Sequence, residues 1–146
     1  MTLGAFGVLI AIGRRDDAGE DLDGWAGVGF RHPVLGMAMV VFMLSLAGIP
    51  PTAGFAGKFY LFSAALQAGY VGLAVVGVAN SLISVAYYFG VLVQMYMVEG
   101  TRAVPRPGGR PWLLATIVLA GVATLWLGLL PAVPMELARE AFASLR

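Results

Sequence analysis

Residues 33–67 read PVLGMAMVVFMLSLAGIPPTAGFAGKFYLFSAALQ, a long apolar stretch that is interrupted once. A continuous helix of that length would be roughly 50 Å long, well beyond the ~30 Å hydrocarbon core of a bilayer. Pro50 and Pro51 remove two backbone donors, and Gly48 and Gly54 permit turns on either side of them. The stretch therefore predicts a discontinuous helix broken between Gly48 and Gly54, although a plain kink or a re-entrant bend would also satisfy it.

Lys58 follows this break by four residues and is the only lysine in the protein. Counted back from Gln67 along a helix, it lies ~13 Å from that end, near the middle of a bilayer. A broken helix with an ionisable residue at mid-depth is typical of an ion path, because exposed backbone and charge persist in a membrane only beside protein or water. The alternative is that Lys58 snorkels to the headgroups, but its stem reaches only about 6 Å.

The composition is that of a membrane protein. Of 146 residues, 60% are hydrophobic and 12% are charged. The net charge is +1, and eight of the nine basic residues are arginines outside the apolar runs, which argues against nucleic-acid binding. The absence of cysteine excludes disulfides and cysteine-ligated iron–sulfur clusters, and one histidine leaves metal binding without a ligand set. We expect this chain to bind no cofactor or metal.

The N-terminal segment 1–13 is apolar but too short to span a bilayer, and two arginines follow it. A signal peptide has the opposite order, with basic residues first and a cleavage site last. We expect residues 1–13 to be the back half of a transmembrane helix. Met1 would then be an internal methionine of a longer protein, or the gene is split there.

The remaining segments alternate between apolar spans and polar connections. The fold expected is an all-α transmembrane bundle with three complete spans, the first one discontinuous. In chain order its elements are the partial span 1–13, the acidic loop 14–32, the broken span 33–67, the turn 68–69, the span 70–98, the loop 99–111, the span 112–130 and a short amphipathic surface helix 133–146.

The arginines predict the orientation of the spans. Six of the eight lie in the loops 14–32 and 99–111, and the turn 68–69 has none. The positive-inside rule puts both loops in the cytoplasm, with that turn and the C-terminus on the opposite side. His32, at the end of the first loop, is either an interfacial or capping residue or a point of proton entry.

Three polar residues of the span 70–98, Asn80, Ser84 and Tyr88, recur at four-residue spacing and share one helical face. Small and hydrogen-bonding residues on such a face are typical of helix–helix packing. Lining of a water or proton path is the alternative.

The segment SLAGIPPTAGFAGKFY, residues 45–60, resembles the discontinuous helix near the C-terminus of the subunit N family of bacterial NADH-quinone oxidoreductase. This family is one of the antiporter-like subunits of respiratory complex I. The opening MTLGAFGV, the acidic loop, the tyrosine pair at 87–88 and the proline-ended last span resemble it in the same order. The chain would cover the last third of the family's fourteen-helix fold, from the end of helix eleven.

The resemblance implies that Lys58 matches the family's proton-channel lysine on the broken twelfth helix. The family's glutamate–lysine pair and its broken seventh helix would lie outside this chain. The chain would be a proton-translocating subunit in the bacterial inner membrane, not catalytic by itself, driven by quinone reduction elsewhere. Its partners would be other membrane subunits, the lipid bilayer and, indirectly, the quinone pool, whereas NADH, FMN, iron–sulfur clusters and quinone would belong to the rest of the complex. The alternative is a subunit of a multi-component cation/proton antiporter or a membrane-bound hydrogenase.

Overall fold

The computed structural model describes residues 1–12, 22–99 and 111–143, and every regular element within these ranges is helical. This agrees with the all-α class expected. The elements are α1 (Thr2–Ile12), the 3₁₀ helix η1 (Leu22–Trp25), α2 (Val28–Arg31), α3 (Pro33–Ala47), α4 (Ala53–Gln67), α5 (Val71–Met97), α6 (Pro111–Leu129) and α7 (Ala132–Ala143).

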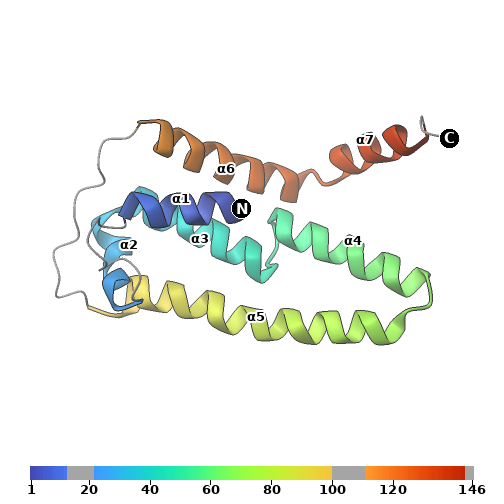
Figure 1. The fold of residues 1–146 in the computed structure, drawn as a ribbon, viewed down its shortest axis with the longest axis horizontal. Helices are drawn as coiled ribbons and strands as arrows, with labels where there is room; N and C mark the ends of the chain where they lie inside the picture. The colour runs from blue at the N-terminus through green and yellow to red at the C-terminus, as the bar shows by residue number, and fades with distance from the viewer. Residues whose placement is uncertain (13–21, 100–110, 144–146) are drawn as a thin grey trace.

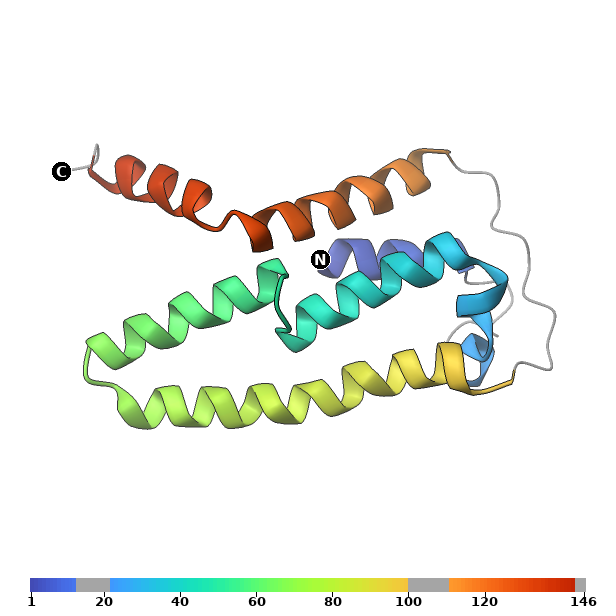
Figure 2. The same ribbon diagram turned by 180° about the vertical axis from the view of Figure 1, so that it is seen from behind.

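The helices form an elongated bundle in which α3 and α4 follow one another along the long axis (Figure 1). Helix α5 runs back beside both of them, and α1 lies beside α3 (Figure 2). Helix α6 packs against α1, α3 and α4, and α7 continues beyond its end. The starts of α3 and α6 and the end of α5 lie together at one end of the bundle, and the α4–α5 turn lies at the other (Figures 1 and 2).

Two helices of the described chain, α5 and α6, are long and apolar enough to cross a membrane, judged by length and composition. Helices α3 and α4 have 15 residues each. At the helical rise each is about 22 Å long, which is short of the ~30 Å hydrocarbon core. A complete crossing by this part of the chain therefore needs both halves of the broken helix.

The core lies around α3, between α1, α5 and α6. Phe42 is fully buried there, and its ring fills the space left open by Gly4 of α1, where a Cβ would overlap the ring. The other members of the cluster are Ala5, Val8, Ile12, Trp25, Val28, Leu35, Met39, Met43, Met95 and Ile117.

Part of the segment expected to be a loop, residues 22–31, is helical and contributes to this core. Trp25 and Val28 are 5% and 0% exposed. Tyr96 of α5 packs on Gly29 and meets Phe30 edge-on, with ring centroids 5.4 Å apart. Burial of these apolar side chains against α5 orders a stretch whose neighbouring acidic residues suggested a solvated loop. The rest of the predicted loop, residues 14–21, lies outside the described residues.

Candidate functional site

The break between α3 and α4 begins at Gly48, whose backbone is in the left-handed region. Gly48 has φ +86°, a region that favours glycine because it has no Cβ. Its N–H donates to the carbonyls of Leu44 and Ser45 at 3.0 and 3.1 Å, and the N–H of Ile49 donates to Leu44 at 3.0 Å. This is the Schellman arrangement, and it satisfies two of the four carbonyls that a helix end leaves unpaired.

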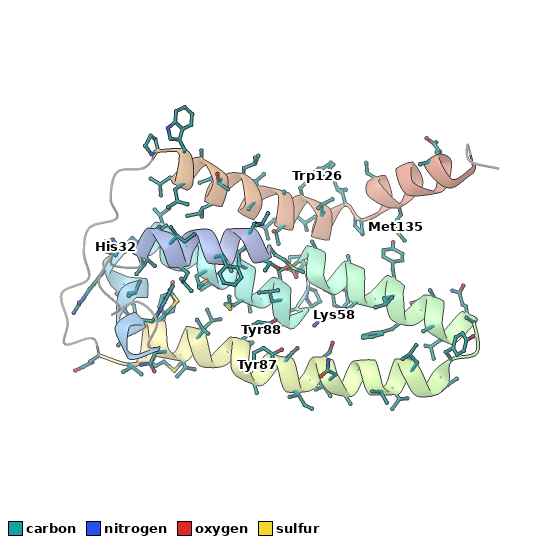
Figure 3. All side chains as sticks on the ribbon, viewed as in Figure 1. His32, Lys58, Tyr87, Tyr88, Trp126 and Met135 are labelled. Carbon is teal, nitrogen blue, oxygen red and sulfur yellow. The ribbon has the colours of Figure 1, made fainter. Side chains whose placement is uncertain are left out.

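Lys58 satisfies the other two. Its Nζ donates to the carbonyl oxygens of Leu46 and Ala47 at 3.0 and 3.1 Å. The lysine therefore reaches back across the break from the second turn of α4 to cap the C-terminus of α3 (Figure 3). A cation at this position also meets the negative end of the α3 dipole, an interaction worth about 0.3–2 kcal/mol.

Ser45 and Gly54 make the reciprocal cap, in which a side chain of α3 satisfies the start of α4. The Gly54 N–H, at the start of α4, donates to the Ser45 Oγ at 3.1 Å. A Cβ on Gly54 would overlap the Ser45 carbonyl, so the two helix ends cross at a distance that only glycine permits. Each helix end thus supplies the group that its neighbour lacks, which keeps backbone polar groups paired inside an apolar bundle.

The link between the helices, residues 48–52, is held by Thr52. The Thr52 side chain is 3% exposed, and its Oγ1 donates to the Ile49 carbonyl at 2.7 Å. Pro50 and Pro51 are exposed, and the peptide bond between them is cis. The structure thus places Gly48, Pro50, Pro51 and Gly54 at the break and Lys58 against it.

The chemistry of this arrangement centres on one amine. Lys58 is half-buried and hydrogen-bonded to carbonyls, which accept from its ammonium without fixing its proton as a carboxylate salt bridge does. An ammonium and a neutral amine can both donate to these carbonyls, but only the ammonium gains from the helix dipole. Either protonation state of the amine can therefore donate to the Leu46 and Ala47 carbonyls.

The three residues predicted on one face of α5 differ in their surroundings. Asn80 is exposed, Ser84 is 8% exposed, and Tyr88 is half-buried. Ser84 Oγ donates to Ser81 of its own helix at 2.6 Å, as packing serines do. In the described part of the chain the hydrogen bonds of Lys58 go to α3 and to none of these three.

An open pocket of about 580 Å³ lies on the α3 side of the break, lined by residues of α1, η1, α3 and α5. Its lining includes Tyr88 and Leu46, the residue whose carbonyl accepts from Lys58. Tyr88 packs on Tyr87 with ring centroids 4.5 Å apart, and Figure 3 shows both on α5. The pocket walls are mostly apolar, with Met39, Met43 and Phe6 among them.

Ser45 and Thr52 are site residues that the sequence analysis did not single out. Both are small hydroxyl residues flanking the glycines and prolines of the break, and that flanking position was the available signal. His32 lies at the start of α3, where its Nε2 is buried and has no partner among the described residues. It is at the far end of α3 from the break.

Comparison with known proteins gives concordant results. The family model described as "NADH:quinone oxidoreductase/Mrp antiporter, TM" matches residues 1–84. The NADH-quinone oxidoreductase subunit N of Trichlorobacter lovleyi is 42% identical over 141 residues, which are 97% of this chain and 29% of that protein. Subunit N 2 of Roseiflexus castenholzii is 47% identical over 138 residues, 94% of this chain and 28% of that one.

A solved structure is similar as well. A chain in the structure of respiratory complex I from Thermus thermophilus with bound aureothin aligns with a TM-score of 0.67 and 40% identity, over 76% of this chain and 26% of that chain. The chain spans less than a third of the length of the curated relatives it matches.

Proposed function

The chain belongs to the family of NADH:quinone oxidoreductase and Mrp antiporter membrane subunits, and on that premise we propose that it forms the Lys58 half of a proton path in a respiratory NADH-quinone oxidoreductase. It is a membrane protein, similar to subunit N of that complex. Its partners would be the other membrane subunits, and the NADH, flavin, iron–sulfur and quinone sites would belong to them. The names of the relatives favour this function over a separate cation/proton antiporter or a hydrogenase.

The observation that carries the proposal is the position of the Lys58 amine, 3.0 and 3.1 Å from the last two carbonyls of α3. In the protonated state the ammonium caps α3 and is stabilised by the helix dipole. When the proton leaves to water or to a neighbouring base, the charge is lost and the cap weakens. Protonation of Lys58 is thereby linked to how firmly the two halves of the broken helix are joined.

The same proposal includes an arrangement in the membrane. The broken helix α3–α4 and the helices α5 and α6 would be the three complete spans, α1 a partial one and α7 a surface helix. Asn80, Ser84 and Tyr88 would line the approach to Lys58. The end of the bundle that holds the start of α3 and the end of α5 would face the cytoplasm, and the α4–α5 turn and the C-terminus the opposite side.

The first test replaces Lys58 in the complete subunit, within the assembled complex. Lys58→Arg keeps donors for the Leu46 and Ala47 carbonyls but stays protonated. Lys58→Met keeps most of the length and removes the donors. We expect both variants to lose most quinone-driven proton uptake in inverted vesicles, measured per assembled complex. If arginine pumps at the wild-type rate, Lys58 is only a cap and the proton path lies elsewhere.

A second test concerns sidedness. Ala68 and Glu99 are both exposed and lie at opposite ends of α5. In intact cells, a membrane-impermeant thiol reagent should label Ala68→Cys and leave Glu99→Cys unlabelled until the cells are opened. The reverse labelling pattern would overturn the orientation.

A third test asks which ion moves. When choline replaces sodium in the inverted vesicles used for the Lys58 variants, sodium-dependent antiport should stop and proton uptake should continue.

A further inference from the structure

Helix α6 ends directly on the break between α3 and α4. At Gly128, one residue before the last of α6, a Cβ would overlap the carbonyl oxygen of Pro51 and lie 2.5 Å from the Cα of Thr52. These are backbone atoms of the link, and they cannot swing aside as the tip of a flexible side chain does. The close approach therefore fixes the link against α6.

The face of α6 that leads to this contact holds the two buried residues of the helix. Ile117 and Thr124 are 1% and 3% exposed, and with Gly121 and Gly128 they recur at helical spacing. A Cβ on Gly121 would meet only the Phe42 ring, at an ordinary 3.9 Å. Gly128 is thus the position on this face where the absence of a side chain lets α6 reach the backbone of the link.

We infer that Gly128 is a positioning residue for Lys58, acting through the backbone of Pro51 and Thr52; the inference rests on the function proposed above. Thr52 precedes the first residue of α4, so displacing it displaces the helix that carries Lys58. The bonds from Lys58 to the α3 carbonyls, at 3.0 and 3.1 Å, tolerate a shift of only a few tenths of an ångström before they lengthen beyond hydrogen-bond range. A Cβ at Gly128 would force a larger shift.

The test compares Gly128→Ala with Gly121→Ala in the assembled complex. Both changes replace glycine by alanine in α6, and they differ in the contact that the new methyl group makes. A displacement near 1 Å at a reacting group commonly lowers a rate by up to about a hundredfold. We expect Gly128→Ala to lower quinone-driven proton uptake per assembled complex by roughly tenfold or more, and Gly121→Ala to leave it unchanged.

The double variant Gly128→Ala/Lys58→Ala distinguishes positioning from general destabilisation. If Gly128 acts through Lys58, the double variant pumps no worse than Lys58→Ala alone, because the effects of coupled residues are not additive. Independent losses that multiply would overturn the inference. So would wild-type pumping by Gly128→Ala. If the single variant Lys58→Ala pumps normally, the proposed function is wrong, and this variant shows that independently of Gly128.

Should Gly128→Ala fail to assemble, a second pair of variants decides the question. Thr52→Gly gives the link the backbone freedom to yield to the new methyl group. In the Gly128→Ala/Thr52→Gly variant, compared with Thr52→Gly alone, pumping per assembled complex is measured again. Because the freed link absorbs the methyl group without moving α4, equal rates in the two variants support the inference, and a tenfold loss relative to Thr52→Gly overturns it.

Discussion

The two halves of the broken helix have equal length and unequal surroundings. Helix α3 buries seven of its 15 residues between α1, α5 and α6, whereas α4 packs against α5 and α6 and buries Gly54 alone. Phe42 of α3 is fully buried, and Phe59 of α4 is 57% exposed. Lys58 belongs to α4, the more exposed half, and donates to the last carbonyls of α3, the packed half.

The two halves also contribute different groups to the break: α3 supplies the carbonyl acceptors and α4 supplies Lys58. The packed half holds its terminal carbonyls in fixed positions, because close-packed interiors resist displacement. The more exposed half, α4, carries the ionisable group and buries only Gly54. Under the function proposed above, loss of the Lys58 proton would weaken the cap between the packed helix α3 and the more exposed helix α4. The predictions below test whether the two halves differ as the structure indicates.

The largest effect is expected where the halves meet. Gly54→Leu places a side chain where even a Cβ would overlap the Ser45 carbonyl, so the helix ends must separate and both reciprocal links are lost. We expect no assembled subunit in the membrane, measured by immunoblot of the isolated complex. Gly57→Leu, in the same helix, is the control, because a Cβ at Gly57 meets nothing within 4 Å. Equal assembly of the two variants would contradict the crossing.

A second comparison removes one ring from each half. Phe42→Ala empties a fully buried site and should destabilise the subunit by about 3–5 kcal/mol. Phe59→Ala removes a ring that is 57% exposed and should cost less than about 1 kcal/mol. The measurement is the midpoint of thermal unfolding of the complex in lipid nanodiscs. Similar shifts for both variants would mean that partners cover α4 as closely as the bundle covers α3.

The smallest effect concerns one hydrogen bond. Ser45→Ala removes the acceptor of the Gly54 N–H and leaves a buried donor unpaired, at a cost of about 1–3 kcal/mol. Ser84→Ala is the control, because Ser84 is similarly buried but bonds only to Ser81 of its own helix. We expect a lower unfolding midpoint and faster amide exchange at residues 53–55 for Ser45→Ala alone. Unchanged amide exchange at residues 53–55 would show that Ser45 does not stabilise the start of α4.

The sequence alone led to the correct family and to the all-helical class, because the pattern around Pro50 and Pro51 is specific and apolar runs of this length form helices in membranes. It did not predict the partners of Lys58, because the acceptors are backbone carbonyls, which every residue carries and no residue type marks. It also did not predict that Trp25 and Val28 are buried, because contacts distant in the chain cover them.

What the sequence determined by itself is therefore local: where helices form, where the proline pair interrupts them, and which single residue carries an amine among apolar neighbours. The tertiary structure decided which groups meet at the interruption. Lys58 caps α3, and Gly54 donates to Ser45. Gly128 of α6 contacts the backbone of Thr52, which lies 76 positions earlier in the chain. The physical reason is that propensity and hydrophobicity act on neighbours along the chain, whereas close approach and capping depend on how separate helices pack.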